Sequence, residues 1–199
     1  MSRIFLATGN KGKVKEIKDL LVGLDVEIMT TFDLGEAPEV VEDGVTLEEN
    51  AIKKARELAD YTELLTIADD TGLLVDALDG RPGVYSARYA GKDATYADNN
   101  RKLLSELSDI PLGKRTARFK TVMALVKPTG EIKTVEGICE GKIGFEAKGE
   151  QGFGYDPLFI PQGYSSTFAE MESELKNQIS HRAKALNKLK EVLQSDWVN

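Results

Sequence analysis

The chain opens with a short apolar run, then a tight glycine-containing loop, then an amphipathic helical pattern. Arg3 to Thr8 is predicted as a buried strand, and Val14, Ile17 and Leu21 recur at helical spacing from about residue 11 onward. The connecting segment, residues 8–13, has the sequence TGNKGK. A strand, a tight loop and a helix in this order are typical of α/β folds.

The rest of the chain continues to alternate between strand and helix patterns. Thr46 and Glu49 form a capping-box pattern that predicts the start of a second helix, and the turn sequence KPTG at residues 127–130 predicts an antiparallel hairpin. Residues 31–44 are predicted as a loop. The expected helices are 47–61, 96–107, a short one after the Thr167 and Glu170 capping pattern, and a last one opening at Ser180; the expected strands are 26–29, 64–68, 73–78, 116–126, 131–139 and 158–160.

We therefore expect one mixed α/β domain over residues 1–199, with a partly antiparallel sheet, flanking helices and two lobes around a central cleft. The 26 Lys and Arg against 33 Asp and Glu give a formal charge of −7, which argues against general nucleic-acid binding. No apolar run approaches the roughly 18–20 residues of a membrane span. The single Cys139 and the lack of an apolar signal segment favour a reducing cytoplasm.

The TGNKGK loop has the composition of an anion-binding loop. N–H groups at a helix start carry partial positive charge, and Gly9 and Gly12 allow the backbone to approach an oxyanion closely. Lys11 and Lys13 stand where the helix dipole disfavours cations by about 0.3–1 kcal/mol each, and a bound anion would reverse that sign. The spacing is not that of a P-loop. The segment predicts a phosphate site, with a solvated glycine turn and two surface lysines as the alternative.

Two adjacent carboxylates, Asp69 and Asp70, follow an apolar run directly. Such a pair repels itself unless a cation or hydrogen-bond donors neutralise it, and Mg²⁺ is the usual partner of carboxylates beside phosphates. A lysine on a helix surface is more often merely solvated. The further candidate ligands and cations are Glu42, Asp43, Glu49, Lys53 and Lys54.

Two further segments admit both a functional and a structural interpretation. Ser180, His181 and Arg182 open the last helix, where two potential cations oppose the dipole, so either an anionic or carbonyl-bearing ligand or a tolerated small penalty explains them. The only histidine of the chain is His181. The segment GFGYDP at residues 152–157 is either a tight structural loop or an aromatic face for a base, where stacking is worth about 1–3 kcal/mol.

Six segments follow one another between about residues 4 and 190: TGNKGK, ENAIKKA, ADDTGL, RPGVYSARYAG, GFGYDPLF and ISHRAKAL. Each is weak alone, but together and in this order the chain resembles the inosine triphosphate pyrophosphatase family, also called XTP/dITP diphosphatases. The resemblance implies a two-lobed mixed α/β fold, a homodimer and dependence on Mg²⁺. It also implies hydrolysis of ITP, dITP and XTP to the monophosphate and pyrophosphate, which clears damaged nucleotides from the pool.

The resemblance also implies roles for individual residues. Asp70 would bind Mg²⁺ together with Glu42 and act as the acid/base residue, while Asp69, Lys13 and Lys54 would complete the catalytic set. Thr71 stands where family members often have Ser, and Val41 stands where some have an acid, so the second metal ligand stays open. The implied substrate-binding residues are Thr8, Gly9, Asn10, Lys11, Gly12 and Lys13 for the triphosphate, Thr71, and Phe153, Gly154, Tyr155, Asp156, Lys176, His181 and Arg182 for the nucleoside.

Two other functions are compatible with parts of this pattern. A Maf-type pyrophosphatase acting on modified pyrimidines would share a phosphate loop and an acidic pair, but it should lack the Ser-His-Arg helix opening. A non-enzymatic nucleotide-binding module would not need a metal-binding aspartate pair beside two phosphate lysines.

Overall fold

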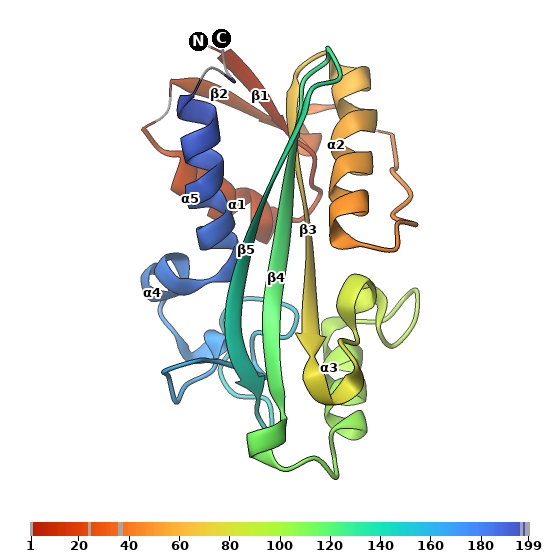
Figure 1. Cartoon of the computed structure of the whole chain (residues 1–199), viewed down its shortest axis with the longest axis vertical. Coiled ribbons are helices and arrows are strands. Elements are labelled where there is room, and N and C mark those ends of the chain that lie inside the picture. The colour runs from red at the N-terminus through yellow and green to blue at the C-terminus, as the bar shows by residue number, and fades with distance from the viewer. Residues whose placement is uncertain (1, 24, 36–37, 196, 198–199) are drawn as a thin grey trace. The chain divides into compact units, whose positions relative to one another are not determined.

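The computed structural model describes residues 2–23, 25–35, 38–195 and 197 (Figure 1). Within them a six-stranded sheet has the order β2-β1-β3-β4-β5-β6. β1 pairs in parallel with β2 and with β3, whereas β5 and β6 are antiparallel, so the predicted mixed sheet is confirmed. The strands are β1 (Ser2–Leu6), β2 (Val26–Thr30), β3 (Leu65–Val75), β4 (Thr116–Val126), β5 (Ile132–Ile143) and β6 (Phe159–Pro161).

The helices begin close to their predicted starts. The Thr46 hydroxyl accepts a hydrogen bond from the Glu49 N–H at 3.1 Å, as the capping pattern predicts. The expected short helix after Thr167 is a 3₁₀ turn, Phe168–Glu170, and a separate helix follows it. The predicted loop 31–44 contains a 3₁₀ turn, Thr31–Asp33, and its residues 36 and 37 lie outside the described part. The helices are α1 (Lys11–Leu21), α2 (Leu47–Thr62), α3 (Tyr96–Glu106), α4 (Ser173–Ile179) and α5 (His181–Gln194).

The chain divides into two compact units, and each is described by itself. The first unit comprises residues 1–70, 121–137 and 182–199, and the second comprises 71–120 and 138–181. In the first unit, α1 and α5 lie on one side of the strands and α2 on the other (Figure 1). Its core joins Ile4 and Leu6 of β1 to Ile17 of α1 and to Leu186 and Leu189 of α5.

The second unit has its own core, which is rich in aromatic rings. Phe119 and Phe159 meet edge to face at 4.7 Å between ring centroids, and Phe168 lies 5.1 Å from Phe159. Leu103 of α3 and Leu107, the C-cap of that helix, pack into the same cluster. Each unit therefore has its own hydrophobic core. The expected cleft between two lobes of one domain stays a prediction.

The prediction of two strands separated at Asp69 to Gly72 is wrong. β3 runs without a break through Leu65–Val75, and Asp76–Leu78 forms a 3₁₀ turn rather than the end of a strand. The Asp-Asp-Thr-Gly composition indicated a turn, but nearly every residue of this strand is buried. Burial against neighbouring elements therefore outweighs the local turn preference.

No helix in the described ranges is both long enough and apolar enough to cross a membrane.

Candidate active site

The TGNKGK segment forms the loop between β1 and α1 and the first turn of that helix. Asn10 is the N-cap, and its side-chain oxygen accepts a hydrogen bond from the Lys13 N–H at 3.2 Å. The Thr8 hydroxyl accepts from the Asn10 N–H at 3.2 Å, and the Thr31 hydroxyl donates to the Thr8 carbonyl at 2.8 Å. A side chain added at Gly9 would meet nothing within 4 Å, so packing does not require glycine there.

Asp69 and Asp70 are neighbours in β3, so their side chains point to opposite faces of the sheet. The residues that they contact agree with this. Asp69 meets side chains from α1 and α5, which lie on one face, and Asp70 meets α2 on the other. The strand therefore separates two charges that the sequence places side by side.

Asp69 is 1% exposed and lies between two cations. The Lys13 Nζ is 2.9 Å from its Oδ2, and the Arg182 Nε is 3.8 Å from the same oxygen. Arg182 also forms an ion pair with Glu16 of α1. Burial alone would raise the pKa of Asp69, but Lys13, Arg182 and Lys54 outweigh it and hold that pKa well below its usual range. Asp69 is therefore ionised and orients the cations around it.

Asp70 has different surroundings on the α2 side. Its Oδ2 accepts a hydrogen bond from the Asn50 amide at 3.1 Å, and Lys54 forms an ion pair with Glu42 nearby. Burial raises the pKa of Asp70, Lys54 lowers it, and the charge of Glu42 adds to the net rise. Burial lowers the pKa of Lys54, but Asp69, Glu42 and Asp70 outweigh that effect and raise it. The raised pKa suits Asp70 to accept a proton.

The donor set around Asp70 fits a hard divalent cation. Asp70 and Glu42 are close enough for the charge of Glu42 to raise the pKa of Asp70. Mg²⁺ prefers such carboxylate oxygens. The described part of the chain holds no group of three or more His, Cys, Asp or Glu side chains that could bind a metal. Two carboxylates match the way Mg²⁺ is held where substrate phosphates supply further ligands.

The second unit holds most of the residues expected at the nucleoside. Asp156 is 3% exposed, and its Oδ2 accepts hydrogen bonds from the Phe153 N–H at 2.8 Å and from the Lys176 Nζ at 2.7 Å. The Lys176 Nζ also lies 5.4 Å from the centre of the Phe153 ring. Gly152 has a φ of +76°, and a side chain there would approach Asp156 to 2.1 Å. This close approach requires glycine.

His181 and Tyr155, which are also expected at the nucleoside, and Thr71, which is expected to contact the substrate, lie in the same unit. His181 is 3% exposed and stacks on Phe119 with 4.6 Å between ring centroids. The Tyr155 hydroxyl donates to the Ser86 carbonyl at 2.9 Å. Thr71 is half-buried and continues β3 directly after Asp70.

The structure thus brings Lys13, Asp69 and Arg182 together in one unit, and Phe153, Asp156 and Lys176 in the other. Arg182 lies beside Asp69, and its expected place at the nucleoside stays a prediction. Lys11 is exposed, with its Nζ 5.9 Å from the centre of the Phe32 ring.

Asn50 and Glu16 contact Asp70 and Arg182, respectively, and no role is predicted for either from the sequence. Asn50 is 1% exposed, and besides donating to Asp70 it accepts a hydrogen bond from the Gly44 N–H at 2.8 Å. A signal was available, because Asn50 is a polar residue on the apolar face of α2 beside Leu47 and Ala51. Glu16 carries no comparable signal, since its partner Arg182 is 166 positions away.

The fold and the site define an α/β protein in which the TGNKGK helix start lies beside a buried pair of carboxylates. The Ham1 family model matches residues 4–192 of this chain. The chain belongs to the Ham1 family, and the family resemblance noted from its sequence segments is confirmed.

The relatives support the same assignment over almost the whole chain. The dITP/XTP pyrophosphatase of Desulforamulus reducens is 51% identical over 197 residues, covering 99% of this chain and 98% of the relative. That of Shouchella clausii is 48% identical, with 99% of each chain covered. Among solved structures, a HAM1 protein from Coxiella burnetii superposes with a TM-score of 0.90 at 40% identity, covering 98% of this chain and 99% of that one.

The different surroundings of the two aspartates predict opposite effects on stability. Asp69→Asn should lower the free energy of unfolding at pH 7 by about 3 kcal/mol, because it removes the buried counter-charge that Lys13 and Arg182 share. Asp70→Asn should leave that free energy unchanged or raise it, because the fold disfavours the ionised form of Asp70. Urea unfolding of both variants and the unchanged protein in EDTA measures the difference.

The pH dependence follows from the directions of the two shifts. The stabilisation from Asp69 is present above its unfolded pKa, about 4, and is lost as the pH falls through its lower folded pKa. The cost of ionising Asp70 appears as the pH rises from about 4 through its raised folded pKa. Equal losses of stability at pH 7 in both variants would refute this division.

Proposed function

We propose that this chain hydrolyses the non-standard purine nucleoside triphosphates dITP, XTP and ITP to the nucleoside monophosphate and pyrophosphate, and so removes them from the nucleotide pool. Relatives that carry the name dITP/XTP pyrophosphatase and are about half identical over nearly the full chain support this activity. The observation that carries it is the ion pair between Lys13, in the first turn of α1, and the buried Asp69, which precedes the buried Asp70 in β3.

The charges around Asp70 support a need for Mg²⁺. Asp70 and Glu42 lie close enough for the charge of Glu42 to raise the pKa of Asp70, and a triphosphate adds further negative charge. Mg²⁺ held by Asp70 and Glu42 would neutralise charge on the phosphates and the pyrophosphate leaving group.

The side chains of this unit supply the remaining requirements of phosphoanhydride cleavage. The N–H groups that open α1 and the side chain of Lys13 would bind the triphosphate oxygens, and Lys54 would add positive charge. Asp70 would take the proton from the attacking water, the acid/base role that the family resemblance implies for it. Asp69 is held by Lys13 and Arg182 and would orient these cations rather than accept a proton.

The base would be selected at its C6 position. The keto oxygen of hypoxanthine or xanthine accepts a hydrogen bond from a donor such as His181, Arg182 or a loop amide, whereas the amino group of adenine presents a donor. A site built to pair with one group can reject the other by about 10⁴-fold, because a desolvated donor is left unpaired. Phe153 would offer its ring face to the base.

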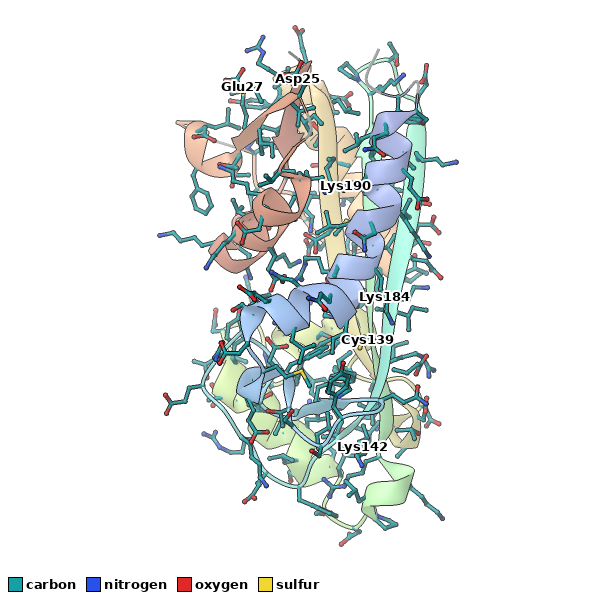
Figure 2. All side chains as sticks on the ribbon, turned by 90° about the vertical axis from the view of Figure 1, so that its left-hand side faces the viewer. Asp25, Glu27, Cys139, Lys142, Lys184 and Lys190 are labelled. Atoms are coloured by element: carbon teal, nitrogen blue, oxygen red, sulfur yellow. The ribbon has the colours of Figure 1, made fainter. Side chains whose placement is uncertain are left out.

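We further propose a homodimer that acts in a reducing cytoplasm. The cytoplasmic setting rests on Cys139, the single cysteine, which is 4% exposed in β5 (Figure 2). The homodimer rests on the family membership. Gel filtration with light scattering tests the dimer directly.

Pyrophosphate release from a panel of nucleoside triphosphates tests the activity. We expect Mg²⁺-dependent turnover of ITP, dITP and XTP, little turnover of ATP, and none in EDTA. Asp70→Asn should abolish turnover while leaving the fold intact, since it removes a charge and almost no volume. Binding without turnover would instead indicate a nucleotide-binding module, and preference for modified pyrimidine triphosphates would indicate a Maf-type enzyme.

The role of Arg182 is decided by comparing two substrates. If Arg182 donates to the C6 keto oxygen, Arg182→Ala should damage ITP hydrolysis far more than ATP hydrolysis, so the ITP/ATP ratio of kcat/KM should collapse. Lys184→Ala is the control, because Lys184 is an exposed cation two residues further along α5 (Figure 2). A preserved ratio with uniformly lower rates would instead assign Arg182 to the phosphates, which both substrates share.

A further inference from the structure

A hydrogen bond joins α3 to the loop of residues 152–157, which is expected at the nucleoside. None of the residues assigned to the site lies in α3. Asn100, in the middle of α3, donates a hydrogen bond from its Nδ2 to the Gly154 carbonyl at 3.0 Å. Gly154 follows Phe153, whose ring is the proposed stacking face. Within the same helix, Tyr96 places its ring centroid 6.3 Å from that of Phe153. The start of α3 therefore lies directly against this loop.

Packing alone does not explain an asparagine at this position. Asparagine is a poorer helix former than leucine, and Leu103 and Leu104 show that this helix uses leucine elsewhere in its packing. The Oδ1 of Asn100 is shielded from solvent and accepts no hydrogen bond from the described residues. A buried polar atom left in this state costs stability, so the amide is retained at a cost. Its contact with the Gly154 carbonyl is the compensating interaction that the structure shows.

The contact complements the other restraints on the loop. The Asp156 carboxylate accepts a hydrogen bond from the Phe153 N–H, and the Tyr155 hydroxyl donates one to the Ser86 carbonyl. Gly154 lies between these two anchored residues with a φ of +64°, a conformation in which its carbonyl can be turned easily. The hydrogen bond from Asn100 to that carbonyl fixes the orientation of the peptide plane between Gly154 and Tyr155.

We propose that Asn100 is a positioning residue for nucleotide recognition, which acts through the Gly154 carbonyl by holding the Phe153 loop in its base-binding conformation. The inference rests on the proposed function and names a residue that supports the nucleoside half of that site. Asn100 lies in the second unit, whereas Lys13, Asp69 and Arg182 lie in the first. A substitution of Asn100 should therefore weaken recognition of the nucleoside and leave binding of the phosphates unchanged.

Two substitutions test this role. Asn100→Asp keeps the shape but sets an oxygen against the Gly154 carbonyl, and Asn100→Leu keeps a similar volume without any donor. Loss of one hydrogen bond of ordinary strength corresponds to about a five- to tenfold change in an equilibrium constant. We expect the KM for ITP to rise about five- to tenfold in both variants, with kcat changed less than about twofold. Arg101→Ala, at the neighbouring and exposed position, is the matched control and should change neither constant.

Inorganic tripolyphosphate, which has no nucleoside, separates positioning from general damage. Its inhibition constant should stay within about twofold of that of the unchanged protein in both Asn100 variants. An unchanged KM for ITP, an equal rise in the tripolyphosphate constant, or failure of both variants to fold would overturn the proposal. Lack of ITP turnover by the unchanged protein would instead refute the proposed function, so the two failures are distinguishable.

Discussion

The buried charge of Asp69 is the interaction on which the arrangement of Lys13 and Arg182 around β3 depends. A carboxylate with 1% exposure is costly unless cations surround it, and Lys13 and Arg182 supply them from α1 and α5. Those helices come from opposite ends of the sequence, yet both pack on the same face of the strands. The ion pairs therefore connect α1, β3 and α5 to one another.

The alternation of side chains along β3 gives the two adjacent aspartates separate tasks. Asp69 faces cations, and its pKa is lowered, so it keeps its charge and orients its neighbours. Asp70 faces Asn50 and the Lys54–Glu42 pair, and burial raises its pKa. The two adjacent carboxylates thus have different surroundings, because a strand turns successive residues to opposite faces. Asp70 is the one that we propose to be reactive.

Local signals predicted the fold well and the contacts poorly. The Thr46 cap and the TGNKGK helix start depend on residues three or four positions apart, and the structure has both where the sequence predicts them. The continuous β3 could not be predicted, because its Asp-Asp-Thr-Gly composition favours a turn and only burial overrides it. The pairing of Arg182 with Glu16, and that of Asn100 with Gly154, depends on how distant elements pack, which local spacing does not encode.

We propose that Asp70 holds the metal ion, whereas Asp69 holds the cations Lys13 and Arg182. Binding of Mn²⁺, a paramagnetic substitute for Mg²⁺, can be followed by electron paramagnetic resonance in the presence of a non-hydrolysable ITP analogue. We predict that Asp70→Asn weakens Mn²⁺ binding at least tenfold and that Asp69→Asn changes it far less. Strong Mn²⁺ binding by Asp70→Asn, with loss of binding in Asp69→Asn, would show that Asp69 holds the metal ion instead.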